Sequence, residues 1–117
     1  MNDIQIFSNT EFGGVRTAEG NGTVLFCGSD VAKALGYSNP SKALADHCRG
    51  DLTNRYPIVD SLGRTQEAIF IPEPDLYRLV FSSKLPTAEK FTDWVTAEVL
   101  PSIRKHGAYM TENTLEN

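Results

Sequence analysis

Four side chains of this 117-residue chain could act as nucleophiles or as soft metal ligands: Cys27, Cys48, His47 and His106. A catalytic cysteine needs a histidine close in space, but His47 and Cys48 are neighbours in a predicted helix, where successive side chains diverge by about 100°. The four residues also lack the closely spaced ligand pairs of zinc sites. We therefore predict neither a catalytic dyad nor a metal site, and we expect both cysteines to be reduced and buried.

The glycine-rich stretches do not form a phosphate-binding loop. Gly13-Gly14 and Gly20-Asn21-Gly22 match neither the G-x-x-x-x-G-K-[ST] pattern nor the G-x-G-x-x-G pattern. The acidic residues offer many carboxylate pairs, but none stands in a motif that fixes a substrate. The sequence therefore predicts a protein that is not an enzyme and needs no cofactor.

Polar and basic side chains in the middle of the chain are better placed for chemistry. Residues 31 to 66 contain five basic residues and three acidic ones, although the whole chain has a formal net charge of −4. Guanidinium and ammonium groups bind phosphates, whereas hydroxyl and amide groups reach base edges. The predicted base contacts are Ser38, Asn39 and Ser41. The predicted cationic contacts to DNA are Lys33, Lys42, Arg49, Arg55 and Arg64.

Two short helices are predicted to position these residues. The first runs from Ser29, a natural N-cap, to Gly36, and the second begins at Asn39-Pro40 and ends at Gly50. A helix pair joined by so short a polar turn is helix-turn-helix-like, and such pairs present the start of the second helix to the major groove. The pair could instead only cap a sheet, because compact helix pairs also occur in folds that bind no DNA.

Alternating apolar residues flank the helix pair and predict strands. A short strand at residues 4–6 and a hairpin that turns at residues 20–22 are predicted to form a small antiparallel sheet, and a second hairpin is predicted over residues 55–71. Pro57 places its strand at an edge, because proline cannot donate to a neighbouring strand.

Two further helices follow the second hairpin. The first starts at residues 73–75, and its predicted buried side consists of Leu76, Tyr77, Leu79, Val80 and Phe81. The second, from about Pro86 to His106, is the longest; Pro101 either kinks it or ends it at Leu100. The predicted fold class is α+β, with a small antiparallel sheet of hairpins, a helix-turn-helix-like pair and a long C-terminal helix.

The length and composition fit one domain that buries its own core, since 40% of the residues are hydrophobic. No run approaches the roughly 18 apolar residues that a membrane span needs, and the first residues do not resemble a signal peptide. We expect a cytoplasmic protein with a domain at residues 1–109 and a polar tail, or the start of a linker, at residues 110–117.

Three collinear stretches carry a family resemblance. They are F-C-G-S-D-V-A-K-A-L-G-Y-S-N-P at residues 26–40, D-L-Y-R-L at residues 75–79, and the stretch from Phe91 through W-V at 94–95 to V-L-P-S-I-R-K at 99–105. Together they resemble the Bro-N domain, the N-terminal module of phage antirepressors and baculovirus repeated-ORF proteins. The resemblance implies an α+β DNA-binding module in a prophage regulator, usually followed by a separate C-terminal domain. Ser29 stands where family members often have a lysine.

Two functions follow from these observations. The first is a DNA-binding module of a phage or prophage antirepressor-type transcription regulator, whose partner is double-stranded, operator-like DNA. The alternative is a protein-binding antirepressor module that inactivates a phage repressor by direct contact without binding DNA, because an acidic surface can steer toward a basic repressor face. The sequence leaves the oligomeric state open, a homo-oligomer included.

Overall fold

The computed structural model describes residues 4–20, 22–49 and 55–104, and the elements below lie in these ranges. The strands are β1 (Gln5–Asn9), β2 (Gly13–Gly20), β3 (Thr23–Cys27), β4 (Arg55–Val59) and β5 (Thr65–Pro72). They form one sheet in the order β1-β2-β3-β5-β4, and each neighbouring pair is antiparallel. The strand that contains Pro57, β4, is an edge strand, as predicted.

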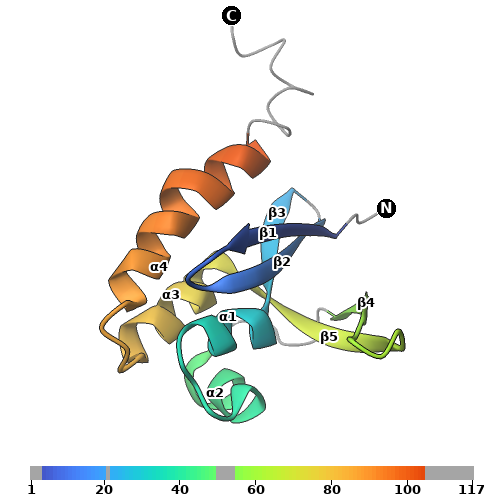
Figure 1. The fold of residues 1–117 in the computed structure, drawn as a ribbon, viewed down its shortest axis with the longest axis horizontal. Helices are drawn as coiled ribbons and strands as arrows, with labels where there is room; N and C mark the ends of the chain where they lie inside the picture. The colour runs from blue at the N-terminus through green and yellow to red at the C-terminus, as the bar shows by residue number, and fades with distance from the viewer. Residues whose placement is uncertain (1–3, 21, 50–54, 105–117) are drawn as a thin grey trace, which may run out of the picture.

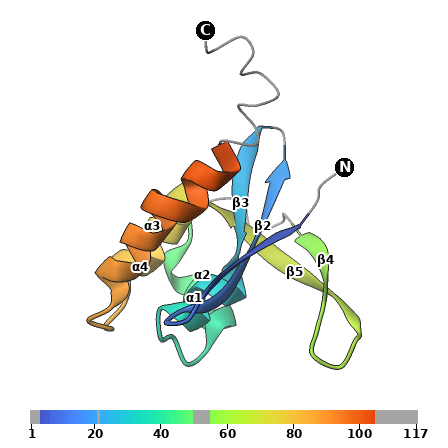
Figure 2. The ribbon, with the colours of Figure 1, turned by 45° about the horizontal axis from the view of Figure 1, so that its top comes forward.

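The helical elements are α1 (Gly28–Ala34), α2 (Pro40–His47), α3 (Glu73–Ser82), α4 (Ala88–Trp94) and the π-helical turn η1 (Val95–Val99). The helices gather on one side of the molecule, and the β4–β5 hairpin extends away from them (Figures 1 and 2). This arrangement confirms the predicted α+β class. α2 ends at His47, earlier than predicted, and Gly50 lies outside the described residues.

Alternation along β3 and β5 gives the sheet two apolar faces. Phe26 pairs with Ile71 in the β3–β5 register, and both belong to the main core. Cys27 pairs with Phe70 one position along, and both belong to a smaller cluster. Since successive side chains of a strand point to opposite faces, this register separates the two clusters.

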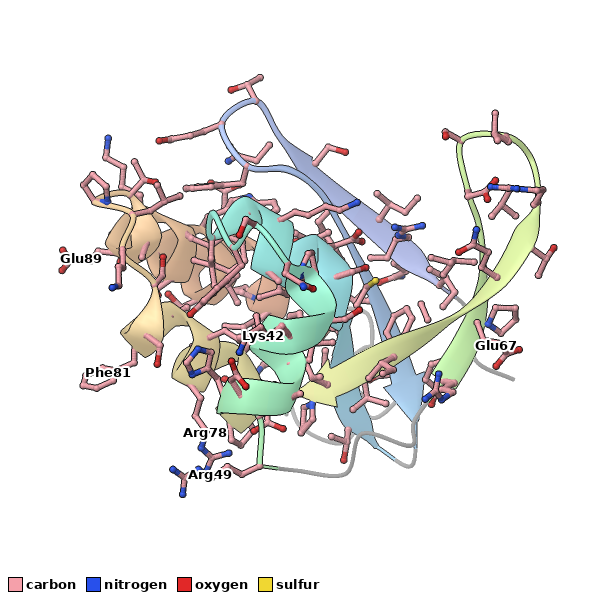
Figure 3. All side chains as sticks on the ribbon, turned by 90° about the horizontal axis from the view of Figure 1, so that it is seen from below. Lys42, Arg49, Glu67, Arg78, Phe81 and Glu89 are labelled. Carbon is pink, nitrogen blue, oxygen red and sulfur yellow. The ribbon has the colours of Figure 1, made fainter. Side chains whose placement is uncertain are left out.

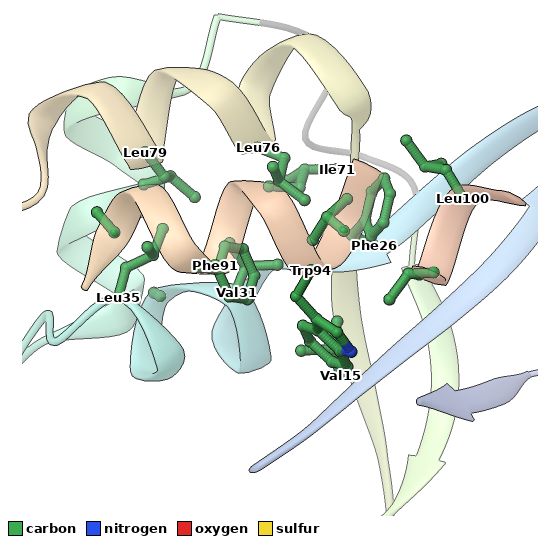
Figure 4. Close-up of a cluster of buried hydrophobic side chains, with 14 of the residues drawn as sticks. Val15, Phe26, Val31, Leu35, Ile71, Leu76, Leu79, Phe91, Trp94 and Leu100 are labelled. Atoms are coloured by element: carbon green, nitrogen blue, oxygen red, sulfur yellow. The ribbon is translucent and has the colours of Figure 1, made fainter. Parts of the chain in front are cut away.

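The main core lies between the sheet and the helices, and Figure 4 shows side chains from both layers interdigitating there. Burying one such side chain stabilises the fold by about 1.5–3 kcal/mol. Members with no exposed surface come from every helix except α2: Val31 from α1, Leu76 and Leu79 from α3, and Phe91 from α4. α2 buries only Ala43 and Leu44, so most of its surface stays free for contacts.

The last helix continues from Ala88 to Arg104 with η1 in its middle. The backbone N–H of Leu100 reaches back five residues to the carbonyl of Val95. On a regular α-helix, Leu100 would lie roughly 180° from Phe91. The wider turn instead brings Leu100 and Ile103 to the core, where they are 2% and 5% exposed. Because the helix continues past Pro101, an end at Leu100 is wrong.

Candidate nucleic-acid interface

Asp30 ties the start of α1 to β2. Its carboxylate accepts hydrogen bonds from Arg16 Nε at 2.8 Å, from Arg16 Nη2 at 2.7 Å and from the backbone N–H of Arg16 at 3.0 Å. The hydrogen bond with Asp30 raises the pKa of Arg16. The predicted N-cap is wrong, because α1 begins at Gly28 and Ser29 lies in its first turn. Asp30, rather than a cap, therefore fixes how the chain leaves the sheet.

Gly36 and Tyr37 shape the turn between α1 and α2. Gly36 has a φ of +84°, in the left-handed region that favours glycine, and a Cβ there would lie 2.7 Å from Leu85. The Tyr37 hydroxyl donates to the carbonyl of Leu79 on α3 at 2.7 Å. The helix pair is thus anchored to α3 as well as to the sheet.

α2 begins as the sequence predicts. Pro40 occupies the first turn, and Asn39 Oδ1 accepts a hydrogen bond of 3.1 Å from the backbone N–H of Lys42. This bond satisfies one of the free N–H groups at the helix start. The amide NH2 of Asn39 is therefore the part of that side chain left to contact a base.

All of the sequence-predicted contact residues are exposed, and they surround α2 rather than form one compact patch. Ser41 of α2 and Arg55 of β4 line one groove, of about 290 Å³, between α2 and the hairpin. Arg49, just after α2, lines a cleft of about 410 Å³ between α2 and α3.

Three further predicted residues line neither of these two hollows. Ser38 lines a third hollow, beside the turn between α1 and α2. Lys33, in the last turn of α1, and Arg64, at the hairpin turn, line none of these three hollows. The structure therefore brings Ser41 and Arg55 together but does not bring Lys33 or Arg64 to them.

Two of the predicted phosphate contacts are already paired with acids. Lys42 Nζ lies 2.8 Å from Asp46 Oδ2, and Arg64 Nε lies 2.9 Å from Asp60 Oδ2. Such exposed pairs are weak, so a phosphate can compete with the acid. The side chains of Arg49 and Arg55 form no ion pair with any described residue. These two arginines are the strongest phosphate-binding candidates.

Asp60 organises the turn of the β4–β5 hairpin. Its carboxylate accepts hydrogen bonds from the backbone N–H groups of Leu62 and Arg64, each at 2.9 Å, and from the Gln66 amide at 2.7 Å. The bond from the backbone N–H of Arg64 is the first cause that holds the pKa of Asp60 below its usual range. Arg64 is therefore part of the turn as well as an exposed cation.

Glu67 is an acidic residue that immediately follows the segment of residues 31–66, in which basic residues outnumber acidic ones. It is exposed and lines the same groove as Ser41 and Arg55. In the β4–β5 register it stands opposite Pro57, two positions from Arg55, so Glu67 and Arg55 lie on one face of the hairpin. Its charge opposes the approach of a phosphate.

Sequence reasoning missed Arg78 and Phe81 on α3. Phe81 was predicted to be buried, but it is 92% exposed. The helical spacing could have shown this, since Phe81 lies roughly 140° around the helix from the buried Leu76. Arg78 lies within the D-L-Y-R-L stretch and lines the same cleft as Arg49. The candidate surface therefore extends from the hairpin across α2 to α3, as Figure 3 shows.

Within residues 4–20, 22–49 and 55–104, no three His, Cys, Asp or Glu side chains group where they could hold a metal ion. The same residues contain no helix that is long and apolar enough to cross a membrane. Both cysteines are free; Cys27 is buried, but Cys48 is only partly buried, so the prediction for Cys48 is wrong. Burial still raises the pKa of the Cys48 thiol to about 11, which keeps it protonated near neutral pH.

Comparison with known protein families shows to which family this chain belongs. The profile of the BRO family N-terminal domain, Bro-N, matches residues 14–101. The chain belongs to the Bro-N family. The three resemblance stretches and the fold described above are thus those of a Bro-N domain.

Relatives of this Bro-N chain come from a bacterium and from viruses. An uncharacterised protein of Haemophilus influenzae is 51% identical over 92 residues, which cover 78% of this chain and 45% of the relative. Two Bro-N domain-containing proteins of Invertebrate iridescent virus 6, 201R and 289L, are 36% and 35% identical over 79% and 81% of this chain, but over only 26% and 27% of their own lengths. The chain therefore spans between a quarter and half of these relatives. No solved structure matches it.

In this Bro-N domain, the stretch at residues 26–40 supplies the frame of the helix pair as well as the exposed side chains of Lys33, Ser38 and Asn39. Asp30 binds Arg16, Gly36 makes the left-handed turn, and Tyr37 binds α3. The exposed side chains of α2 stand on this frame. The names of the matched Bro-N relatives describe no enzyme.

Proposed function

We propose that this Bro-N chain is the DNA-binding module of a phage or prophage antirepressor-type transcription regulator, which binds double-stranded DNA in the cytoplasm of the host cell. The observation that carries this proposal is the exposed side of α2, which has on each flank an arginine that forms no ion pair with any described residue. Arg55 lies on the hairpin side and Arg49 on the α3 side. An α-helix fits the major groove, and cations beside it fit the phosphates that border the groove.

In the proposed complex, the start of α2 approaches the bases. Ser38, the Asn39 amide and Ser41 supply short hydrogen-bonding groups there, and Lys42 exchanges Asp46 for a phosphate. Arg55 and Arg64 bring the β4–β5 hairpin to the backbone as a wing beside the helix pair.

The test is fluorescence anisotropy with a labelled duplex from the prophage operator region, a random duplex of equal length and a salt series. If the protein neutralises three to five phosphates, the logarithm of the binding constant falls with the logarithm of the salt concentration, with a slope of roughly −3 to −4.5. Replacing Arg49 and Arg55 together by Ala reduces both affinity and slope, whereas Lys90→Ala on α4, an exposed cation away from α2, changes neither. Binding that does not depend on salt would contradict this function.

The alternative is a protein-binding module that contacts the basic face of a phage repressor. It is favoured by exposed acids on the last helix: Glu89, Asp93 and Glu98. A folded sample that fails to bind any duplex at low salt, but that forms a complex with a purified phage repressor in sedimentation, would support this alternative.

A further inference from the structure

Phe81 is the most exposed of the large apolar side chains in the described part of the chain. One exposed apolar residue is ordinary on a protein surface. Phe81 is unusual because of its neighbours, since it lines the cleft between α2 and α3 together with Arg49 and Arg78. An aromatic ring and two guanidinium groups thus share one small surface.

These three side chains project from the same end of the molecule (Figure 3). Arg78 and Phe81 are three residues apart on α3, so they lie on one face of that helix. Arg49 reaches the cleft from the other wall, at the end of α2. The two cations therefore stand beside the ring on elements that are far apart in the sequence.

The buried carboxylate of Asp75 holds Arg78 and the backbone of Arg49 in place. It has no exposed surface, and its Oδ1 accepts hydrogen bonds from Arg78 Nη1 at 2.6 Å and from the backbone N–H of Arg49 at 2.9 Å. Arg78 nevertheless keeps 44% of its side-chain surface exposed. The buried carboxylate thus orients Arg78 and fixes the backbone of Arg49, while both guanidinium groups remain accessible to a ligand.

We propose that Phe81 is a wedge that inserts at a base-pair step of duplex DNA while Arg49 and Arg78 bind the phosphates beside that step. This inference rests on the proposed DNA-binding function and extends the interface from α2 to α3. Apolar side chains that enter a step from the minor groove partly unstack it and kink the duplex by roughly 20–90°. The phosphate contacts offset the cost of unstacking.

The surroundings of Phe81 favour DNA over a protein partner. A protein-binding hot spot is the centre of an apolar area that excludes water. The other lining residues of the cleft are mostly polar or charged, and include Asp46, His47 and Ser82. The cleft also continues the surface of α2, since Asp46 and His47 at the end of that helix line it.

The test uses a duplex that carries 2-aminopurine at successive steps, together with a second duplex labelled with a donor and an acceptor dye at its ends. Wild-type protein should raise 2-aminopurine fluorescence several-fold at one step and shorten the end-to-end distance. Phe81→Ala should abolish both signals while the protein keeps its thermal stability. Ile6→Ala, which removes another exposed apolar side chain on β1, should leave both signals unchanged.

Arg78→Ala gives an independent readout, because removing one phosphate contact reduces the magnitude of the salt slope by about 0.9. If wild-type protein binds the duplex with a salt-dependent affinity but neither unstacks nor bends it, the wedge is wrong and Phe81 is assigned to a protein contact. If wild-type protein binds no duplex at all, the proposed function itself fails. Equal signals from wild type and Phe81→Ala would also overturn the wedge.

Discussion

The backbone N–H of Arg49 donates a 2.9 Å hydrogen bond to Oδ1 of Asp75, which lies 26 residues further along the chain and has no exposed surface. The bond joins the segment after α2 to the first turn of α3. Asp75 therefore links the backbone at one edge of the candidate interface to the core, and Arg78 binds the same oxygen.

Asp75→Asn should weaken both the fold and the interface. A neutral amide can still accept hydrogen bonds through its oxygen, but it cannot form an ion pair with Arg78. We expect the free energy of unfolding to fall by about 1–2 kcal/mol, the difference between a buried hydrogen bond to a charged group and one to a neutral group. Urea denaturation measures this loss of stability. Asp46→Asn, which changes an exposed ion pair, should lower the free energy of unfolding by clearly less. Equal stabilities for the two variants would contradict this role.

Two glycines with the same backbone conformation should respond differently to alanine. Gly36 and Gly63 have φ values of +84° and +80°, but only at Gly36 would a Cβ meet another group, Leu85 at 2.7 Å. Gly63→Ala should cost about 1 kcal/mol, because only the left-handed backbone is strained. Gly36→Ala should cost a further 1–3 kcal/mol or so from overpacking. Denaturant titrations under the same conditions compare the stabilities of the two variants. A larger loss of stability for Gly63→Ala would disprove the packing argument.

The lowered pKa of Asp60 predicts an acid-sensitive hairpin turn. Because the folded pKa lies below the ordinary value of 3.8, the turn is fully stabilised above that pH and loses this stabilisation as the pH falls through the folded pKa. Amide NMR signals of Leu62 and Arg64 should therefore shift together below pH 3.8. Asp60→Asn should remove this titration, and a midpoint above the ordinary value would show that the hydrogen bonds do not favour the carboxylate.

Removing the charge of Glu67 should strengthen DNA binding. Glu67 shares a groove with Arg55, so its carboxylate repels a phosphate that Arg55 attracts. Glu67→Gln should raise the affinity roughly two- to fivefold, the range expected for one exposed charge. Anisotropy at low salt measures the change, and Glu89→Gln on α4 serves as the matched control. An unchanged affinity would place the DNA away from this groove.

The local features of the fold could be predicted from the sequence. Asn39-Pro40 begins α2 because a cap and a proline suit that position, and Pro57 marks an edge strand because it lacks an N–H. These effects depend on neighbours in the chain, so the sequence alone reveals them. The domain limits at residues 109 and 110 stay a prediction, since the described residues end at Arg104.

Features that depend on distant contacts could not be predicted in this way. Asp30 lies in the first turn of α1, where an acid favours a helix start, but its partner Arg16 lies on a strand. Arg78 joins Arg49 in one cleft only because α3 packs beside α2. The candidate site is therefore assembled by tertiary packing, and its residues are spread over more elements than the helix-turn-helix-like pair.

The π-helical turn η1 takes up one extra residue of the last helix. The segments before and after this turn reach the same core only because the turn holds one residue more than an α-helical turn. Deleting the exposed Ala97 would remove that residue, and a regular α-helix would then place Leu100 eight residues after Phe91, roughly 80° around the helix instead of 180°. Leu100 and Ile103 would therefore still face the core. Inserting one more residue there would instead rotate both side chains by roughly 100° and turn them away from the sheet, although no buried residue had been changed.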